Sequence, residues 1–132
     1  MDLLRAWVTA MVVFVLASMV TTVAAVGSDA AVDGLNDTTA DRIAWNAVPM
    51  LLTFAAMTAL GGAAHPRPQR FDTRRHAVAT LAVPAALIPL ALVYGLFNGP
   101  ALSAWSGFVG ALAGTASGWG LLRVARRLRS PG

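Results

Sequence analysis

The sequence predicts an all-α integral membrane protein, a four-helix bundle built from two hairpins, with its N- and C-termini in the cytoplasm. Three observations support this prediction: the composition, the length of the apolar blocks and the distribution of arginine. Of the 132 residues, 57% are hydrophobic and only 12% are charged. Ordinary soluble domains have about a quarter charged residues, so this composition favours a chain that lies mostly in lipid.

Four apolar blocks have the length of a bilayer span. A helix of about 20 residues crosses the hydrocarbon core, which is about 30 Å thick. We therefore expect spans at approximately 4–26, 43–64, 77–97 and 101–122. An outer loop (27–42), a cytoplasmic loop (65–76) and a basic tail (123–132) account for the rest, so residues 1–132 form a single membrane domain.

The first span has a second interpretation, because Arg5 before an apolar run is also how a secretory signal begins. The apolar region of a signal usually has 7–15 residues, whereas Trp7–Val26 is an uncharged run of about 20. We expect this helix to be retained in the membrane. Cleavage near Ala24 would leave a product with three helices.

Caps and prolines indicate where the helices begin, bend and turn. Thr38 or Thr39 is expected to cap the second helix, and Pro49 is expected to bend it if it begins that early. In the third helix, Thr80 is expected to satisfy a backbone carbonyl that Pro84 leaves free. The sequence Asn98-Gly99-Pro100 predicts a tight turn between the last two helices.

The fourth span carries small residues on one side and bulky residues, such as Trp105 and Phe108, on the other. Small residues spaced by four let two helices approach closely in lipid. We interpret this side as a helix-packing face, a glycine zipper, with Ala55, Ala59 and Ala63 as the best partner row within the chain. The span is only weakly apolar, so we expect it to insert together with the third. The predicted packing face consists of Ser103, Ser106, Gly107, Gly110, Ala111, Gly114 and Gly118.

Arginine predicts the orientation, because cytoplasmic loops are enriched in positive charge. All ten basic residues are arginine, and with four spans only Arg42 falls on the outer side, together with four of the six aspartates. This bias against lysine and glutamate is typical of a GC-rich genome, such as that of a haloarchaeon or an actinomycete. Beyond Arg5, the arginines expected to orient the chain and to contact lipid head groups are Arg67, Arg70, Arg74, Arg75, Arg123, Arg126, Arg127 and Arg129.

Polar residues outside the spans suggest little chemistry. Asn36 begins an Asn-x-Thr triplet in the outer loop and is a candidate glycosylation site. His65 and His76 bracket the cytoplasmic loop, and we interpret them as interfacial residues at helix ends. No ionisable residue lies at membrane depth and the chain has no cysteine, so we expect no catalytic residue, no cofactor and no metal site.

These patterns predict a non-enzymatic, multi-pass protein of the cell membrane. We expect a structural or accessory component that packs through its small-residue face with itself, as a homo-oligomer, or with a larger membrane complex. Its other partner is the lipid bilayer, and nucleic acid is not expected as a partner because stacking residues are missing from the basic tail. The alternative is a homo-oligomeric channel or carrier for a small uncharged solute.

Overall fold

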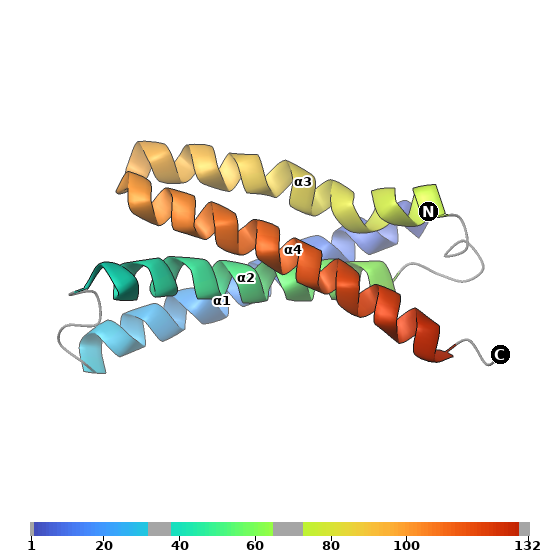
Figure 1. Cartoon of the computed structure of the whole chain (residues 1–132), viewed down its shortest axis with the longest axis horizontal. Coiled ribbons are helices and arrows are strands. Elements are labelled where there is room, and N and C mark those ends of the chain that lie inside the picture. Colours follow the sequence, from blue (N-terminus) through green and yellow to red (C-terminus); the bar gives the residue numbers. More distant parts are fainter. Residues whose placement is uncertain (1, 32–37, 65–72, 130–132) are drawn as a thin grey trace.

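The computed structural model describes residues 2–31, 38–64 and 73–129. This part of the chain forms four helices, α1 (Asp2–Ala31), α2 (Thr39–Ala63), α3 (Thr73–Asn98) and α4 (Ala101–Arg129). Successive helices run in opposite directions, so the start of α1 and the finish of α4 lie at the same end of the bundle (Figure 1). We call the other end, where α3 turns into α4, the hairpin end. The all-helical prediction is confirmed.

The helices extend beyond the apolar blocks at several ends. Residues 27–31 belong to α1 and residues 39–42 to α2, so both edges of the expected outer loop are helical. Likewise α3 begins at Thr73, inside the expected cytoplasmic loop, and α4 includes residues 123–129 of the basic tail. The bilayer thickness limits how many residues must be apolar, but it does not limit how far a helix continues into water.

A capping box begins α2. The Thr38 hydroxyl accepts a hydrogen bond from the Asp41 amide at 3.1 Å, and the Asp41 carboxylate accepts one from the Thr38 amide at 3.3 Å. This reciprocal pair satisfies backbone donors that the first turn leaves unpaired. Pro49 therefore lies inside α2, where it has no amide hydrogen to donate to the carbonyl one turn earlier.

Two prolines also lie within α3, which remains one helix from Thr73 to Asn98. The hydroxyl of Thr80 donates to the carbonyl of His76 at 2.8 Å and not to the carbonyl that Pro84 frees. Our expectation for Thr80 was wrong. Pro84 frees the backbone carbonyl of Thr80 itself, whereas a threonine hydroxyl in a helix donates to the carbonyl one turn earlier, here that of His76. Gly99 and Pro100 make the short turn into α4.

Helix α2 is the centre of the bundle. It packs against α1, α3 and α4, most extensively against α4, whereas the backbones of α1 and α4 do not come close to each other within the described residues. The core cluster combines residues from all four helices. Its fully buried members are Ala10, Phe54, Met57, Ile88 and Ala111.

The outward surface of the bundle is largely apolar. Three of the four described helices are long and apolar enough to cross a membrane, through Leu3–Ala24, Thr39–Ala63 and Arg74–Asn98. Within these segments only 11%, 22% and 22% of the most apolar stretch is buried. A soluble protein rarely exposes so much contiguous apolar surface, so the fold is consistent with a membrane protein. Helix α4 is not among the three, because glycine and serine dilute its apolar residues.

Candidate functional site

Helices α4 and α2 approach each other closely along a seam of small residues. Gly110, Gly114 and Gly118 lie against the backbone of Ala47, Leu51 and Ala55, respectively. A Cβ placed on Gly118 would be 2.5 Å from the carbonyl oxygen of Ala55, which is far inside contact distance. Both sets of residues recur every fourth position, so α2 and α4 pack parallel and in register. We call these six residues the α2–α4 seam.

The rest of the predicted packing face lies on the same side of α4. Ser106, Gly107 and Ala111 are buried, and Ser103 is half-buried. The Ser106 hydroxyl donates to the Ser103 carbonyl at 3.1 Å, so it is satisfied within its own helix. The face that the sequence singled out is therefore directed into the chain itself.

On α2, the partner row of the seam shares only Ala55 with the row expected from the sequence. The other two partners are Leu51 and Ala47, one and two turns earlier, whereas Ala59 is half-buried and Ala63 is exposed. Helices α2 and α4 start at the same end of the bundle (Figure 1). The glycines of α4 therefore come level with the middle of α2.

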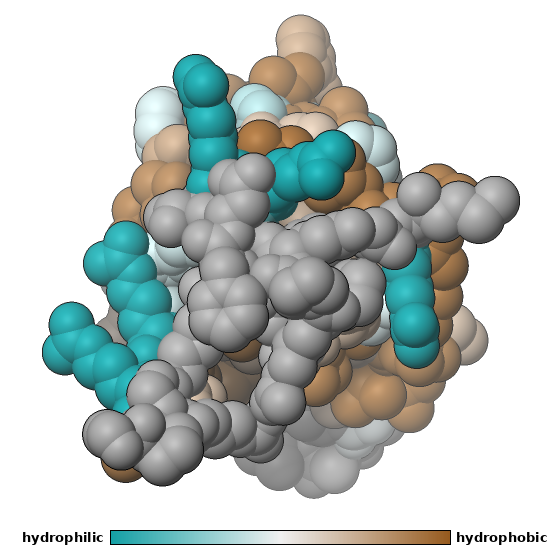
Figure 2. Space-filling model, turned by 90° about the vertical axis from the view of Figure 1, so that its right-hand side faces the viewer, coloured by the Kyte–Doolittle hydropathy of each residue, from teal (hydrophilic) through white to brown (hydrophobic). Residues whose placement is uncertain are grey.

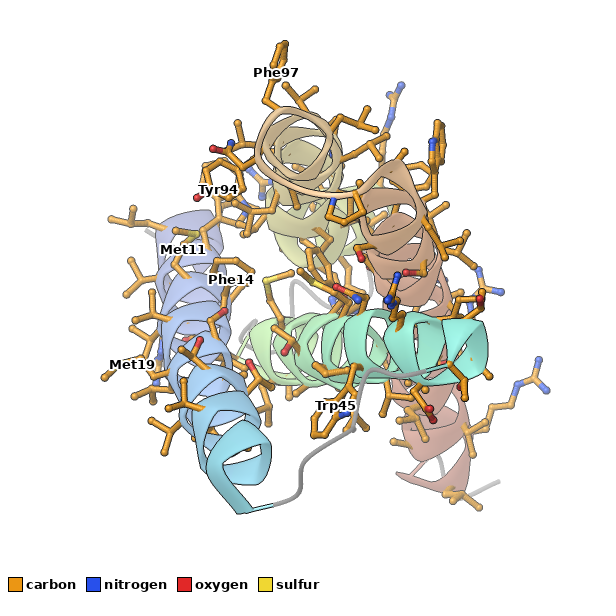
Figure 3. The ribbon with its side chains drawn as sticks, turned by 90° about the vertical axis from the view of Figure 1, so that its left-hand side faces the viewer. Met11, Phe14, Met19, Trp45, Tyr94 and Phe97 are labelled. Carbon is orange, nitrogen blue, oxygen red and sulfur yellow. The ribbon has the colours of Figure 1, made fainter. Side chains whose placement is uncertain are left out.

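An apolar pocket of about 730 Å³ lies beside the seam, towards the hairpin end. Figure 3 looks along the bundle from this end, and Phe14 reaches from α1 towards the space between the helices, while Phe97 points away from it. All four helices contribute to the wall. The lining residues are Phe14, Asn46, Met50, Leu87, Leu90, Ala91, Tyr94, Gly95, Asn98, Gly99, Pro100, Ser103, Ala104, Gly107 and Phe108.

The few polar groups of this pocket come from its hairpin end. The Asn46 amide donates to the carbonyl of Arg42 at 2.7 Å, and the Asn98 amide donates to the carbonyl of Tyr94 at 2.9 Å. No lining residue among those described carries a charge at neutral pH. Sequence reasoning missed this pocket, because its wall combines positions from four helices with no common spacing.

The buried side chain of His76 lies between α3 and α4, near the end of the bundle opposite the hairpin end. His76 is 1% exposed, and its ring stacks on Trp119 with centroids 5.6 Å apart. The guanidinium of Arg123 lies 5.4 Å from the centre of the Trp119 ring, within cation–π range. His76 lies in the first turn of α3, at a helix end as expected, but the sequence did not predict that its ring is buried against α4.

Glycine on α2 allows a close approach of helices near this histidine. A Cβ on Gly62 would meet the side chains of Thr80 and Leu122, so a larger residue there would require these side chains of α3 and α4 to shift. The adjacent glycines Gly61-Gly62 are the sequence signal that could have indicated this close approach. Gly61 similarly packs against Ala10 of α1, where a Cβ would be 3.2 Å from the alanine Cβ.

Thr58 of α2 is also buried in this region. Its hydroxyl has no hydrogen-bond partner among the described residues. It differs from Thr9, Thr22 and Thr115, whose hydroxyls each donate to the carbonyl four residues earlier. A Cβ on Gly118 would lie 2.9 Å from the Cβ of Thr58, so this threonine borders the α2–α4 seam.

Exposed arginines gather at the end of the bundle that holds the two termini. Figure 2 views this end and shows long hydrophilic side chains around an apolar body. We call it the arginine end, and its exposed members are Arg5, Arg74, Arg75, Arg123 and Arg127. Arg126 and Arg129 belong to the last turns of α4. Asn36, His65, Arg67 and Arg70 lie outside the described residues.

Comparisons with protein-family models, with curated proteins and with solved structures found no match to this chain. The function must therefore be inferred from the structure. Its main features are the closely packed helices α2 and α4, the uncharged apolar pocket and the exposed arginines at the arginine end.

Proposed function

We propose that this chain is a small, non-enzymatic, multi-pass protein of the cell membrane that serves as a structural or accessory component. The observation that carries the proposal is the contact of Gly110, Gly114 and Gly118 with the α2 backbone. These residues are specialised for close packing, and van der Waals packing is what drives helix association in lipid. The seam makes α2 and α4 one stiff unit, and the outward faces of α1 and α3 are available to lipid and to a second copy or a larger complex.

All four helices cross the membrane in this proposal, including α4. Its apolar residues alone make it a weak inserter. The turn of Gly99 and Pro100 couples α4 to α3, however, and the seam gives it a partner along much of its length. Insertion as part of a hairpin, followed by packing against α2, supports its crossing.

Charge supports an orientation with both termini in the cytoplasm. The arginine end carries five exposed arginines from α1, α3 and α4, whereas Arg42 is the arginine at the start of α2, near the hairpin end. Positive charge near span ends is retained on the cytoplasmic side. Arginine there is also attracted to anionic lipid by about 1 kcal/mol each.

Substitution of the seam tests the packing role. Gly114→Leu is expected to break the α2–α4 contact, lower the melting temperature in mild detergent and reduce crosslinking between copies or to a complex. Gly120→Leu is the matched control, because a Cβ on Gly120 meets nothing within 4 Å. Unchanged melting and crosslinking in Gly114→Leu would overturn the proposal.

The absence of cysteine makes the orientation easy to test. Single variants Thr38→Cys and Arg127→Cys place one thiol at each end of the bundle. In intact cells, a membrane-impermeant maleimide is expected to label Thr38→Cys and to leave Arg127→Cys unlabelled until the membrane is opened. The reverse pattern, or equal labelling, would contradict the proposed topology.

The apolar pocket favours a second candidate function, a homo-oligomeric channel or carrier for a small uncharged solute. Its wall has no charged side chain among the described residues, which suits a neutral solute. In this case purified protein in vesicles would conduct such a solute, and Gly107→Leu would reduce the flux by filling the pocket. Vesicles as tight as protein-free ones would exclude this function.

A further inference from the structure

The apolar pocket is a partly open cavity whose wall includes residues of all four helices, and its exposed lining residues lie towards the hairpin end. Along α3 its lining extends from Leu87 to Asn98, about 16 Å at the rise of an α-helix. Its volume of about 730 Å³ lies within the range of ligand pockets in proteins. The pocket is therefore long enough, and large enough, for one extended apolar molecule.

The chemistry of the wall changes along this length. Phe14, Met50, Leu87 and Phe108 line the deeper part, whereas Asn98 and Ser103 belong to the hairpin end. An apolar cavity does not hold water well, because water there lacks hydrogen-bond partners. A charged molecule would lose its hydration without gaining a counter-charge. The occupant should therefore be an apolar chain with its polar group at the hairpin end.

We propose that the pocket binds one acyl chain of a membrane lipid, with the lipid head group at the hairpin end. This inference rests on the membrane placement proposed above, because acyl chains are then the apolar molecules next to the pocket. Asn98, Ser103 and Tyr94 supply uncharged hydrogen-bonding groups at the depth of the ester linkage. Arg42 lies one helical turn before Asn46 on α2, at the level of the lipid phosphate.

Photo-crosslinking in lipid bilayers tests the proposal with the full chain. The probe is phosphatidylglycerol with a diazirine near the end of one acyl chain, incorporated in nanodiscs, and the adducts are mapped by mass spectrometry. We expect adducts on pocket residues such as Met50 and Phe108 in addition to outward residues such as Val20 and Leu121, which are 68% and 61% exposed.

Two variants fill the pocket from different walls. Gly107→Leu is expected to abolish the pocket adducts, because a Cβ there has ordinary contacts, 3.6 Å to Met50 and 3.9 Å to the Asn46 carbonyl, and the rest of the side chain enters the pocket. Ala91→Leu fills it from α3 and should have the same effect. Gly120→Leu is the matched control and should leave all adducts unchanged, and circular dichroism checks that each variant is folded.

The outcomes separate this proposal from the membrane placement on which it rests. Adducts on outward residues alone, or pocket adducts that persist in both filled variants, would overturn the acyl-chain proposal and leave the placement intact. Displacement of the pocket adducts by a short-chain alcohol would also overturn it, in favour of solute binding. Loss of all adducts would contradict the membrane placement itself.

Discussion

Gly114 of α4 lies directly against the backbone carbonyl of Leu51 of α2, with no room for a side chain between them. The same relationship recurs one turn away on each side, at Gly110 and Gly118. Gly120, on the same helix, has open space around it. Glycines within one helix therefore have opposite roles, which mutation can distinguish.

We predict that Gly114→Ala destabilises the bundle, whereas Gly120→Ala does not. A methyl group at Gly114 must push α2 and α4 apart, and overpacking of this kind costs about 1–3 kcal/mol. At Gly120 the methyl group meets no neighbour, and alanine is favoured over glycine in a helix by about 0.5–1 kcal/mol. Thermal unfolding in mild detergent, followed by circular dichroism, measures both changes.

The two alanine variants control for each other, because they make the same chemical change in the same helix. If both raised the stability, helix propensity would dominate and the seam would be loose enough to accept a methyl group. If both lowered it, the open space at Gly120 would have to be filled by a partner outside the chain.

The sequence was sufficient to predict the helical class, the small-residue face of α4 and a threonine cap of α2, with Thr38 and Thr39 as candidates, because each depends on local spacing or local hydrogen bonding. It was not sufficient for the register of the seam. Ala47 and Ala63 are equally small, so residue size does not predict which of them packs against α4. Because α2 and α4 start at the same end of the bundle, α4 packs against Ala47. The burial of His76 and the apolar pocket were missed for a related reason, since both depend on how three or four helices come together.

We predict that Thr58→Val stabilises the protein and that Thr80→Val destabilises it. The Thr58 hydroxyl is buried with no partner among the described residues, and an unsatisfied buried group costs about 1–3 kcal/mol. Valine has the same shape and removes that cost. Thr80→Val loses the hydrogen bond to the His76 carbonyl, worth about 0.5–1.5 kcal/mol.

Unfolding of the two valine variants under the same conditions checks this pair. Because the substitution is identical, the sign of the stability change in each variant reports whether the hydroxyl that was removed had a hydrogen-bond partner. Destabilisation by Thr58→Val equal to that by Thr80→Val would mean that the Thr58 hydroxyl has a partner, such as a buried water, that satisfies it.

We predict that His76→Ala weakens the contact between α3 and α4. The His76 ring is buried and stacked on Trp119, so its removal leaves a cavity, and large-to-small changes in a core cost about 2–5 kcal/mol. His76→Phe keeps an aromatic ring against Trp119 and should retain most of the stability. Thermal unfolding of the wild type, His76→Ala and His76→Phe measures these changes. If both variants were equally unstable, the contact would need imidazole specifically and not just an aromatic ring.

We predict that Thr38→Ala frays the start of α2. The variant removes the side-chain oxygen that accepts from the Asp41 amide, and loss of such a cap costs about 0.5–2 kcal/mol. The first turn is largely exposed at the end of the bundle, where water competes for its amides, so the effect is local. Amide hydrogen exchange should be faster for residues 39–42 and unchanged in the seam. Thr39→Ala is the control, because Thr39 lies within the helix and is not its cap. Faster exchange at Gly114 as well would show that the cap supports the whole α2–α4 unit, since α2 would then loosen along its length.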